Sequence, residues 1–536
     1  MATSVFDLRD EARHASKSAH DRMKFEQMIF ESDAYPSGSK VGKLPSVAGQ
    51  SIDPKVRKAV VRLGHAFEEQ MARIEVQPDK TAHMLEHIEL CEDIQNWVEM
   101  NDDAASEGEQ LRTAILHHNV YGQAVSKAIW DNRNHVARLK TIHPMNFYVD
   151  PACSMQDLSD AEHVWHSEWQ TIDRIKREYP DFQLDVRYKE ENVWGRREQE
   201  VLRVDEGWLR KERAMEAGIK CEDARHDIVM VVIIDDKVHG AWESPFWWPD
   251  MPFVGWRNFT GLCDKGKLSH KFYGYGYGTF MWPQQKLLDE LLANLVLIVR
   301  NLSVGRFITK RGALDMQRIL AEHGLNIELE EGYGIEDINH LPPDEIPAAL
   351  FSFVEYVVSM MEDMAPSLNP VFTGQQPEHQ SSGRAINSLQ FAAYSQISSN
   401  IRQQNDFRLR RERMKVTLLQ QYAKKPLRPH KWRGGLDLPD KFPEDARWIG
   451  YQLAMPDTTG MPNTPAGRLQ VVQMLASMGM VLSPEKLIEF LGLDRGYGIK
   501  AEDFMPMVTQ PGMAGGATQV DEQVSSGLES AMRVER

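Results

Sequence analysis

The sequence is poor in cysteine and in long apolar runs. Its four thiols lie far apart along 536 residues and form no C-x-x-C pair: Cys91, Cys153, Cys221 and Cys263. A disulfide framework or a thiolate zinc site is therefore not expected. The longest apolar helical runs, Leu291–Val299 and Ile346–Met361, fall short of the roughly 18 residues that a membrane span requires. The sequence thus predicts no membrane partner.

Positive charge is also scarce. Lys and Arg total 62 against 78 Asp and Glu, which gives a net charge of −16. A protein that coats nucleic acid without sequence preference needs clustered positive charge, so that class is not expected. A protein that lets nucleic acid pass without holding it remains compatible with this composition.

The shortage of positive charge is concentrated in one block. The 65 residues between Arg318 and Arg384 contain no Lys or Arg, and they hold twelve acidic residues. A charge run is often only a solvated surface, but this one spans several expected elements and would repel a polyanion. Residues 402–433 are the opposite, with eleven basic and two acidic residues and a net charge of +9.

Hydrophobic periodicity predicts an α+β protein that is mainly helical. Residues 1–50 show a polar start and then a Pro/Gly/Ser-rich stretch, with no expected helix or strand. Asp53-Pro54 is a helix N-cap signal. Helices are expected from there to about residue 76, from residue 81, and over 105–119, 171–179, 284–303, 313–323, 348–364, 382–423, 466–478 and 483–491. Strands are expected at 123–130 and 136–142, paired around Asp131-Asn132, and at 164–169, 228–234 and 238–242.

Several histidines raise the question of a metal. His83, Glu86 and His87 match H-x-x-E-H, the inverted zincin pattern, and Glu162 is available as a third ligand. Short patterns also arise by chance, and Glu162 lies in a segment with β character, so ordinary helix packing is the favoured interpretation. The pairs His163/His166 and His117/His118 are weaker signals. Glycines alternate with tyrosines in 273–278, but the phosphate-loop ending is missing. We expect no catalytic residue, no metal and no cofactor.

Four segments follow one another along the chain in an order that can be compared with known families: VYGQAVSKAIW, IHPMNFYVDPACSMQDLSDAEHVWHSEW, KFYGYGYGTFMWPQQKLLDELLANL and FTGQQPEHQSSGRAINSLQ. This order resembles the portal proteins, or head-to-tail connectors, of short-tailed bacteriophages. The resemblance covers about residues 55–495. The first resembles a helix end, glycine and strand of the family, and the second its wing segment. The third is similar to the entry of its first stem helix, and the last to a Gly/Ser-rich stretch before a long helix.

The resemblance implies a portal fold with wing, stem, clip and short crown. On this mapping, residues 1–282 form the wing with N-terminal helices and a β-rich part. The remaining regions are the first stem helix (284–303), the clip (304–345), the channel-lining second stem helix (346–364), the tunnel loop (365–381), further wing (382–460), the crown (463–495) and a C-terminal tail (496–536). Only a short crown fits, because about 45 residues follow Leu491.

The resemblance also implies the function and the partners. Portal proteins form a homo-oligomeric ring, of twelve subunits, at one vertex of the capsid of the virion, and they assemble in the host cytoplasm. Double-stranded DNA passes through the ring during packaging and ejection, without sequence-specific contacts. A separate terminase drives packaging, tail adaptor proteins bind later, and the major capsid and scaffolding proteins surround the ring. The portal is a structural protein and not an enzyme.

The mapping assigns candidate residues to two regions. The candidates for the DNA channel and tunnel loop are Glu355, Glu362, Asp363, Gln375, Gln376, His379 and Gln380. The candidates for terminase or adaptor docking on the clip are Lys310, Arg311, Glu328, Glu330 and Glu331. An acidic wall would keep DNA from being trapped. The basic region 402–433 would supply contacts between subunits or meet acidic faces of a neighbour. The alternatives are the zinc peptidase and another ring-forming connector, such as a tail adaptor.

Overall fold

The computed structural model divides into two compact units, Met1–Asp457 and Thr458–Arg536. It describes residues 4–31, 40–41, 44–45, 51, 53–69, 71, 74–78, 85–181, 201–221, 227–260, 272–303, 306–309, 338–341, 348–365, 383–423, 451–454, 472 and 487. All helices and strands below belong to the first unit. The helices expected at 313–323, 466–478 and 483–491, and with them the expected crown and tail, lie outside these residues apart from the two isolated positions.

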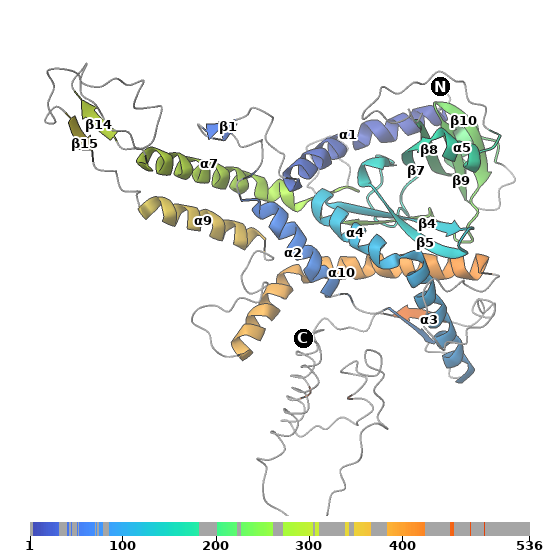
Figure 1. The fold of residues 1–536 in the computed structure, drawn as a ribbon. Coiled ribbons are helices and arrows are strands. Elements are labelled where there is room, and N and C mark those ends of the chain that lie inside the picture. Colours follow the sequence, from blue (N-terminus) through green and yellow to red (C-terminus); the bar gives the residue numbers. More distant parts are fainter. Residues whose placement is uncertain are drawn as a thin grey trace, which may run out of the picture. The chain divides into compact units, whose positions relative to one another are not determined.

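Nine α-helices and one short 3₁₀ helix are found in the described residues (Figure 1). They are α1 (Val5–Phe30), α2 (Lys55–Glu69), α3 (Leu85–Ala105), α4 (Glu107–Tyr121), η1 (Pro144–Asn146), α5 (Ile172–Glu178), α6 (Lys211–Glu216), α7 (Tyr277–Ser303), α9 (Ala348–Met364) and α10 (Gly383–Tyr422). The expected helix at 348–364 is confirmed, and the long helix expected at 382–423 differs by one residue at each end.

Two antiparallel sheets form the β-rich part. The larger has the order β10-β9-β8-β7-β6, and the smaller has the order β11-β4-β5. Their strands are β4 (Gln123–Asp131), β5 (Val136–Ile142), β6 (Phe147–Val149), β7 (His163–Thr171), β8 (Val201–Arg210), β9 (Ile228–Ile234), β10 (Lys237–Glu243) and β11 (Phe253–Arg257). Four two-stranded pairs complete the described strands: β1 (Lys40–Val41) with β2 (Leu44–Pro45), β3 (Glu75–Pro78) with β16 (Tyr451–Ala454), β12 (Phe259–Thr260) with β13 (Gly274–Tyr275), and β14 (Arg306–Thr309) with β15 (Ile338–Leu341).

The β4–β5 hairpin confirms the turn that the sequence predicts. Asp131 pairs with Val136 in the register, and the Asp131 carboxylate accepts hydrogen bonds from the backbone N–H groups of Arg133 and Asn134. A short acidic side chain that satisfies turn amides in this way is a typical local hairpin device. The other predicted strands are confirmed in β7, β9 and β10.

The helix expected from Asp53-Pro54 to residue 76 is shorter than predicted. It ends at Glu69, and β3 occupies part of its expected range, where the Val76 N–H donates to the side chain of Gln95. The Asp53 carboxylate does not cap α2. It pairs instead with Lys55 and Lys58.

Helix α1 has no counterpart among the predicted elements. It covers one face of the larger sheet, where Leu8 and Ala12 join Trp165 and Val231 in a small core. Its Arg9 and Arg13, together with His20 and Glu26, are buried or half-buried polar residues on the packed side of the helix. These polar side chains interrupt the apolar periodicity, which explains why the sequence pattern did not reveal the helix.

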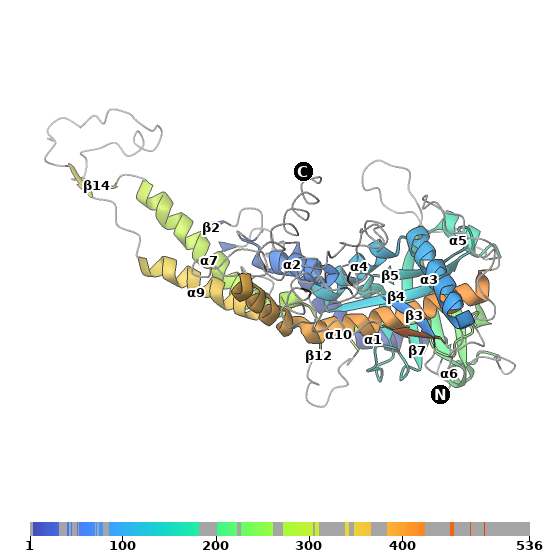
Figure 2. The same ribbon diagram turned by 90° about the horizontal axis from the view of Figure 1, so that it is seen from below.

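The main core lies around α2, α4, α10 and the smaller sheet. Phe67, Trp97, Trp256 and Phe407 are fully buried there, and His118 stacks on Trp256 with ring centroids 3.7 Å apart. Helix α10 runs along the smaller sheet, as both ribbon views show (Figures 1 and 2). This single 40-residue helix therefore joins the smaller sheet to α3 and to β16.

Candidate functional site

The candidate channel residues lie partly within the described chain. Glu355, Glu362 and Asp363 are on α9. The other channel candidates lie outside the described residues: Gln375, Gln376, His379 and Gln380. All five clip candidates also lie outside them: Lys310, Arg311, Glu328, Glu330 and Glu331. Of the residues 304–345 that the sequence assigns to a clip, the structure describes only β14 and β15, which pair with each other in antiparallel register.

Helices α7 and α9 lie side by side (Figures 1 and 2). Helix α7 begins inside the main core, where Tyr277, Met281 and Leu288 are buried. Its later turns are more open, and Val296 and Val299 are exposed. The pair is therefore anchored at one end of α7 and carries solvent-exposed apolar side chains farther along.

One face of α9 is packed. Val357, Met361 and Ala365 are buried in the main core, and the half-buried Val354 and Val358 lie beside them. Spacings of three and four residues place these side chains on one side of a helix. This face fixes α9 against the rest of the first unit.

A second face of α9 is acidic. Glu355 and Glu362 are seven residues apart and therefore lie on the same side of the helix. Glu355 is exposed and Glu362 is half-buried. Asp363 is exposed too, but at about 100° per residue it lies around the helix from these two carboxylates, next to Tyr356. The helix contains no Lys or Arg to neutralise them.

A third face of α9 is apolar and exposed. It carries Phe353, Tyr356, Met360 and Met364, spaced by three or four residues. Tyr356 is 60% exposed, and its ring stacks against Phe353 with centroids 6.5 Å apart. A row of large apolar side chains in water is costly for a single chain and marks an interaction surface. The spacing of this row is visible in the sequence, but the same residues also fit a buried core helix, so an exposed row was not predicted.

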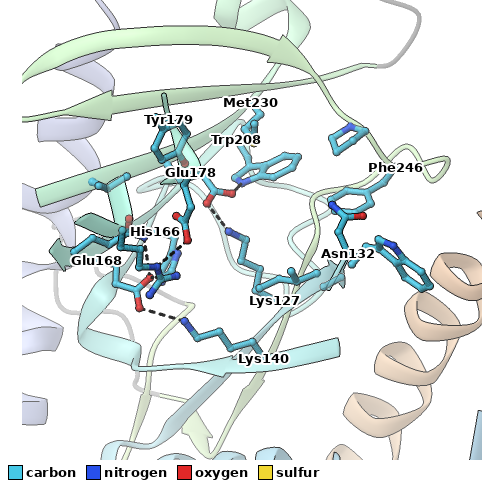
Figure 3. Close-up of a pocket in the computed structure, with 18 of the residues that line it drawn as sticks. Lys127, Asn132, Lys140, His166, Glu168, Glu178, Tyr179, Trp208, Met230 and Phe246 are labelled. Carbon is cyan, nitrogen blue, oxygen red and sulfur yellow. Dashed lines mark hydrogen bonds and ion pairs between the residues drawn. The ribbon is translucent and has the colours of Figure 1, made fainter. Parts of the chain in front are cut away.

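A pocket of about 400 Å³ lies between the two sheets, bordered also by α5 and by Tyr422 of α10 (Figure 3). Its polar end contains three ion pairs: Lys127–Glu206, Lys140–Glu168 and Arg174–Glu178. Lys127 and Lys140 are direct register partners on β4 and β5. Their like charges are compensated by two carboxylates of the larger sheet, Glu206 on β8 and Glu168 on β7. The three pairs leave the pocket without net charge.

His166 lines the same pocket, and its surroundings there favour the neutral imidazole. Burial, together with the nearby Lys127, lowers the pKa of His166 to about 4. The Glu206 carboxylate accepts hydrogen bonds from Lys127 and from the indole N–H of Trp208. We interpret the pocket as a seam between the two sheets, with ion pairs at its polar end and aromatic side chains such as Trp208 and Phe246 elsewhere in its lining.

The described residues do not support the metal hypotheses. Glu162 lies just before β7, with its carboxylate 3.4 Å from the guanidinium of Arg213. His83 and the side chains of Glu86 and His87 lie outside the described residues. Within the described part of the chain, no group of three His, Cys, Asp or Glu side chains could hold a metal ion. No described helix is both long and apolar enough to span a lipid bilayer.

The comparison with protein families decides the assignment. The family model of the phage P22-like portal protein matches residues 121–429, more than half of the chain. This chain belongs to that portal protein family. A chain of the virion of a native gene transfer agent (GTA) particle is similar in structure, with a TM-score of 0.40 and 12% sequence identity over 82% of this chain and 89% of that chain. No curated protein matches.

The basic region of this portal protein departs from the prediction at two of its charges. Residues 402–433 were expected to face a neighbouring subunit, but two of their charges are buried inside the chain. Arg411 donates hydrogen bonds to Ser126 and Glu107, and Lys415 is 1% exposed. These charges hold α10 to the surrounding elements and are not available to a partner. The remainder of the region from 424 onward lies outside the described residues.

Proposed function

We propose that copies of this portal protein assemble into a ring at one capsid vertex, and that the ring forms the channel for genome packaging and ejection. The family assignment supports a structural role in a virion. In this proposal α7 and α9 are the paired stem helices, and α9 lines the channel. The tunnel loop follows α9, and the clip lies between the two helices in the chain.

The observation that carries the proposal is the division of α9 into three faces. The first, with Val357 and Met361, packs inside its own chain. A helix that lines a ring needs two further faces: one toward the next copy and one toward the lumen. The exposed row with Tyr356 and Met360 suits the first, because burial of apolar surface drives association. The acidic row with Glu355 and Glu362 suits the second.

The charge of α9 fits a channel that releases DNA. Each phosphate that a Lys or Arg neutralises adds binding free energy through counterion release. A wall with Glu355, Glu362 and Asp363 and without basic residues forms no such contacts. Gln375, Gln376, His379 and Gln380 would add polar, mostly uncharged groups in the tunnel loop. The clip, with Lys310, Arg311, Glu328, Glu330 and Glu331, would dock the terminase and later the tail adaptor.

The ring is tested on the purified full-length chain by native mass spectrometry with negative-stain images. We expect a closed ring of about twelve copies, the number that the resemblance implies. Tyr356→Asp places a charge in the apolar row and should abolish the ring. Ser359→Asp lies on the same turn of α9 but beside the acidic row, and should leave the ring intact. A wild-type chain that stays monomeric would contradict the ring, and intact Tyr356→Asp rings would contradict the assigned face.

A further inference from the structure

The first turn of α7 is hydrogen-bonded to a residue far away in the chain. The Glu26 carboxylate on α1 accepts hydrogen bonds from the backbone N–H of Gly276, 2.8 Å away, and from the hydroxyl of Thr279. Glu26 is 1% exposed. The first N–H groups of a helix have no partner within the helix, and a carboxylate at this end is favourable with the helix dipole. Glu26 therefore acts as the cap of α7, supplied by a different helix.

Two neighbours of Glu26 strengthen the same junction. The Arg22 guanidinium donates to the carbonyl oxygen of Gly274 at 2.6 Å and lies over the ring of Tyr275, 3.9 Å from its centroid. Phe25 meets Trp282 edge-to-face, with centroids 5.7 Å apart. All these contacts are with residues before Pro283.

Pro283 interrupts the helix just after this anchored segment. It lies inside α7 and has no N–H, so the helical hydrogen bond to the carbonyl of Thr279 cannot form. Proline in a helix interior weakens the helix locally and permits a bend. The direction of α7 beyond this point therefore depends on contacts made after Pro283.

Beyond Pro283, α7 packs against α9 and α2, and the buried hydrogen bonds described next join it to α2. The Gln285 side-chain oxygen accepts the backbone N–H of Lys55 at 3.0 Å and that of Val56 at 3.4 Å, which are the first N–H groups of α2. The Gln285 amide donates to the Asp53 carbonyl oxygen at 2.8 Å and to the Asp289 carboxylate at 3.2 Å. Gln285 is 1% exposed. One buried amide thus caps α2 and ties it to α7.

We propose that Glu26 and Gln285 are positioning residues that set the direction of α7 on the two sides of Pro283. Glu26 fixes the segment before the proline to α1, which is itself bound to the larger sheet through Arg9 and Arg13 with Asp205. Gln285 fixes the segment after it to α2. The inference rests on the proposed role of α7 as a stem helix, because the direction of that helix would determine how stem and sheets fit together in a ring.

The test measures the direction of α7 within one chain. Spin labels are attached at Glu212→Cys on α6 and Val299→Cys on α7, in a full-length chain that also carries Cys221→Ser and Cys263→Ser. The labelled chain is mixed with an excess of unlabelled chain, so that only distances within a chain are read by pulsed electron resonance. We expect Glu26→Ala and Gln285→Ala each to broaden the distance distribution and shift its mean.

Two kinds of control accompany these variants. Glu26→Gln keeps the shape and an acceptor oxygen and should restore the wild-type distribution. Glu26→Met fills similar space without that oxygen and should not restore it, whereas a purely space-filling role would predict that both variants do. Lys24→Ala and Lys286→Ala change exposed neighbours on α1 and α7 and should have no effect. Circular dichroism melts verify that each variant is folded.

Wild-type distance distributions in Glu26→Ala and Gln285→Ala would overturn the inference. The mass of the assembly, measured on the same samples, reports separately on the proposed function. Broadened distances in a chain that never forms rings would support the positioning roles and overturn the stem assignment. Rings of the wild-type chain, together with unchanged distances in the variants, would support the stem assignment and overturn the positioning roles.

Discussion

The Nζ atom of Lys415 on α10 lies 2.6 Å from a carboxylate oxygen of Asp102 on α3. The same ammonium donates to Glu412 at 2.8 Å. Burial alone would lower the pKa of Lys415, but the carboxylates of Asp102, Glu412 and Glu107 outweigh it and raise that pKa above its usual value. The buried lysine is thus held charged, and it binds the C-terminal part of the long helix to α3.

The first prediction concerns this ion pair. Lys415→Met leaves Asp102 and Glu412 without their shared cation, and breaking a buried pair in this way costs about 3–5 kcal/mol of unfolding free energy. Urea unfolding followed by circular dichroism measures the loss. Lys24→Met, at an exposed position, should change stability by less than about 0.5 kcal/mol. Equal effects of the two substitutions would mean that Lys415 does not hold α10.

The second prediction compares two glycines. A Cβ at Gly276 would overlap the carbonyl oxygen of Val120, which is backbone and cannot move aside, so Gly276→Ala should destabilise by about 4 kcal/mol or more. Gly108 in α4 has nothing within 4 Å of a Cβ. Gly108→Ala should be neutral or stabilising by up to about 1 kcal/mol. Thermal melts of both variants test the contrast, and a stable Gly276→Ala protein would contradict the packing at the start of α7.

The third prediction is that His118 causes part of the protein's loss of stability in acid. Burial lowers the pKa of His118 to about 4, whereas in the unfolded chain it is about 6.5. The folded state therefore disfavours the protonated ring, and the stabilisation is complete above about pH 6.5 and decreases as the pH falls toward 4. At pH 5 this histidine should account for roughly 1–2 kcal/mol. His118→Phe keeps an aromatic ring against Trp256 but cannot be protonated. Urea unfolding should therefore show a smaller decrease in the free energy of unfolding between pH 7.5 and pH 5 than in the wild type. An unchanged decrease would show that His118 is not its cause.

The fourth prediction concerns the acidic face of α9. Assembled rings with Glu355→Lys and Glu362→Lys together should retain double-stranded DNA, because each lysine can neutralise a phosphate. The retention should fall steeply with salt, more steeply than for wild type. The pair Glu355→Gln and Glu362→Gln removes the negative charge without adding a positive one, and should bind DNA less than the lysine variant. If lysines leave the salt dependence unchanged, these residues do not face the DNA.

The sequence predicts elements well where one local pattern determines them. Helix α9 matches its predicted range, because a run of apolar residues rich in Val and Met is bounded by Pro347 and by Ala365-Pro366. The β4–β5 hairpin is equally local, since Asp131 satisfies the turn by itself.

Elements that depend on distant partners were missed or misplaced. The start of α7 precedes Pro283, against the usual rule, because Glu26 caps it from α1. Strand β8 was not predicted, since it carries Asp205 and Glu206, charges that α1 and β4 neutralise. For the candidate site, Glu355 and Glu362 could be selected from sequence, but their separation from the exposed apolar row required knowledge of which face is packed.

The capping of α7 by α1 has a consequence for synthesis on the ribosome. Glu26 and Gly276 are 250 residues apart. At a synthesis rate of about 5–20 residues per second, α1 is therefore complete about 10–50 s before the segment that it caps has been made. A helix with a fully apolar inner face would expose an aggregation-prone surface during that time. The polar residues on the packed side of α1, among them Arg9, His20 and Glu26, remain hydrated until their partners emerge. The polar residues that interrupt the apolar periodicity of α1 would thus protect the nascent chain from aggregation.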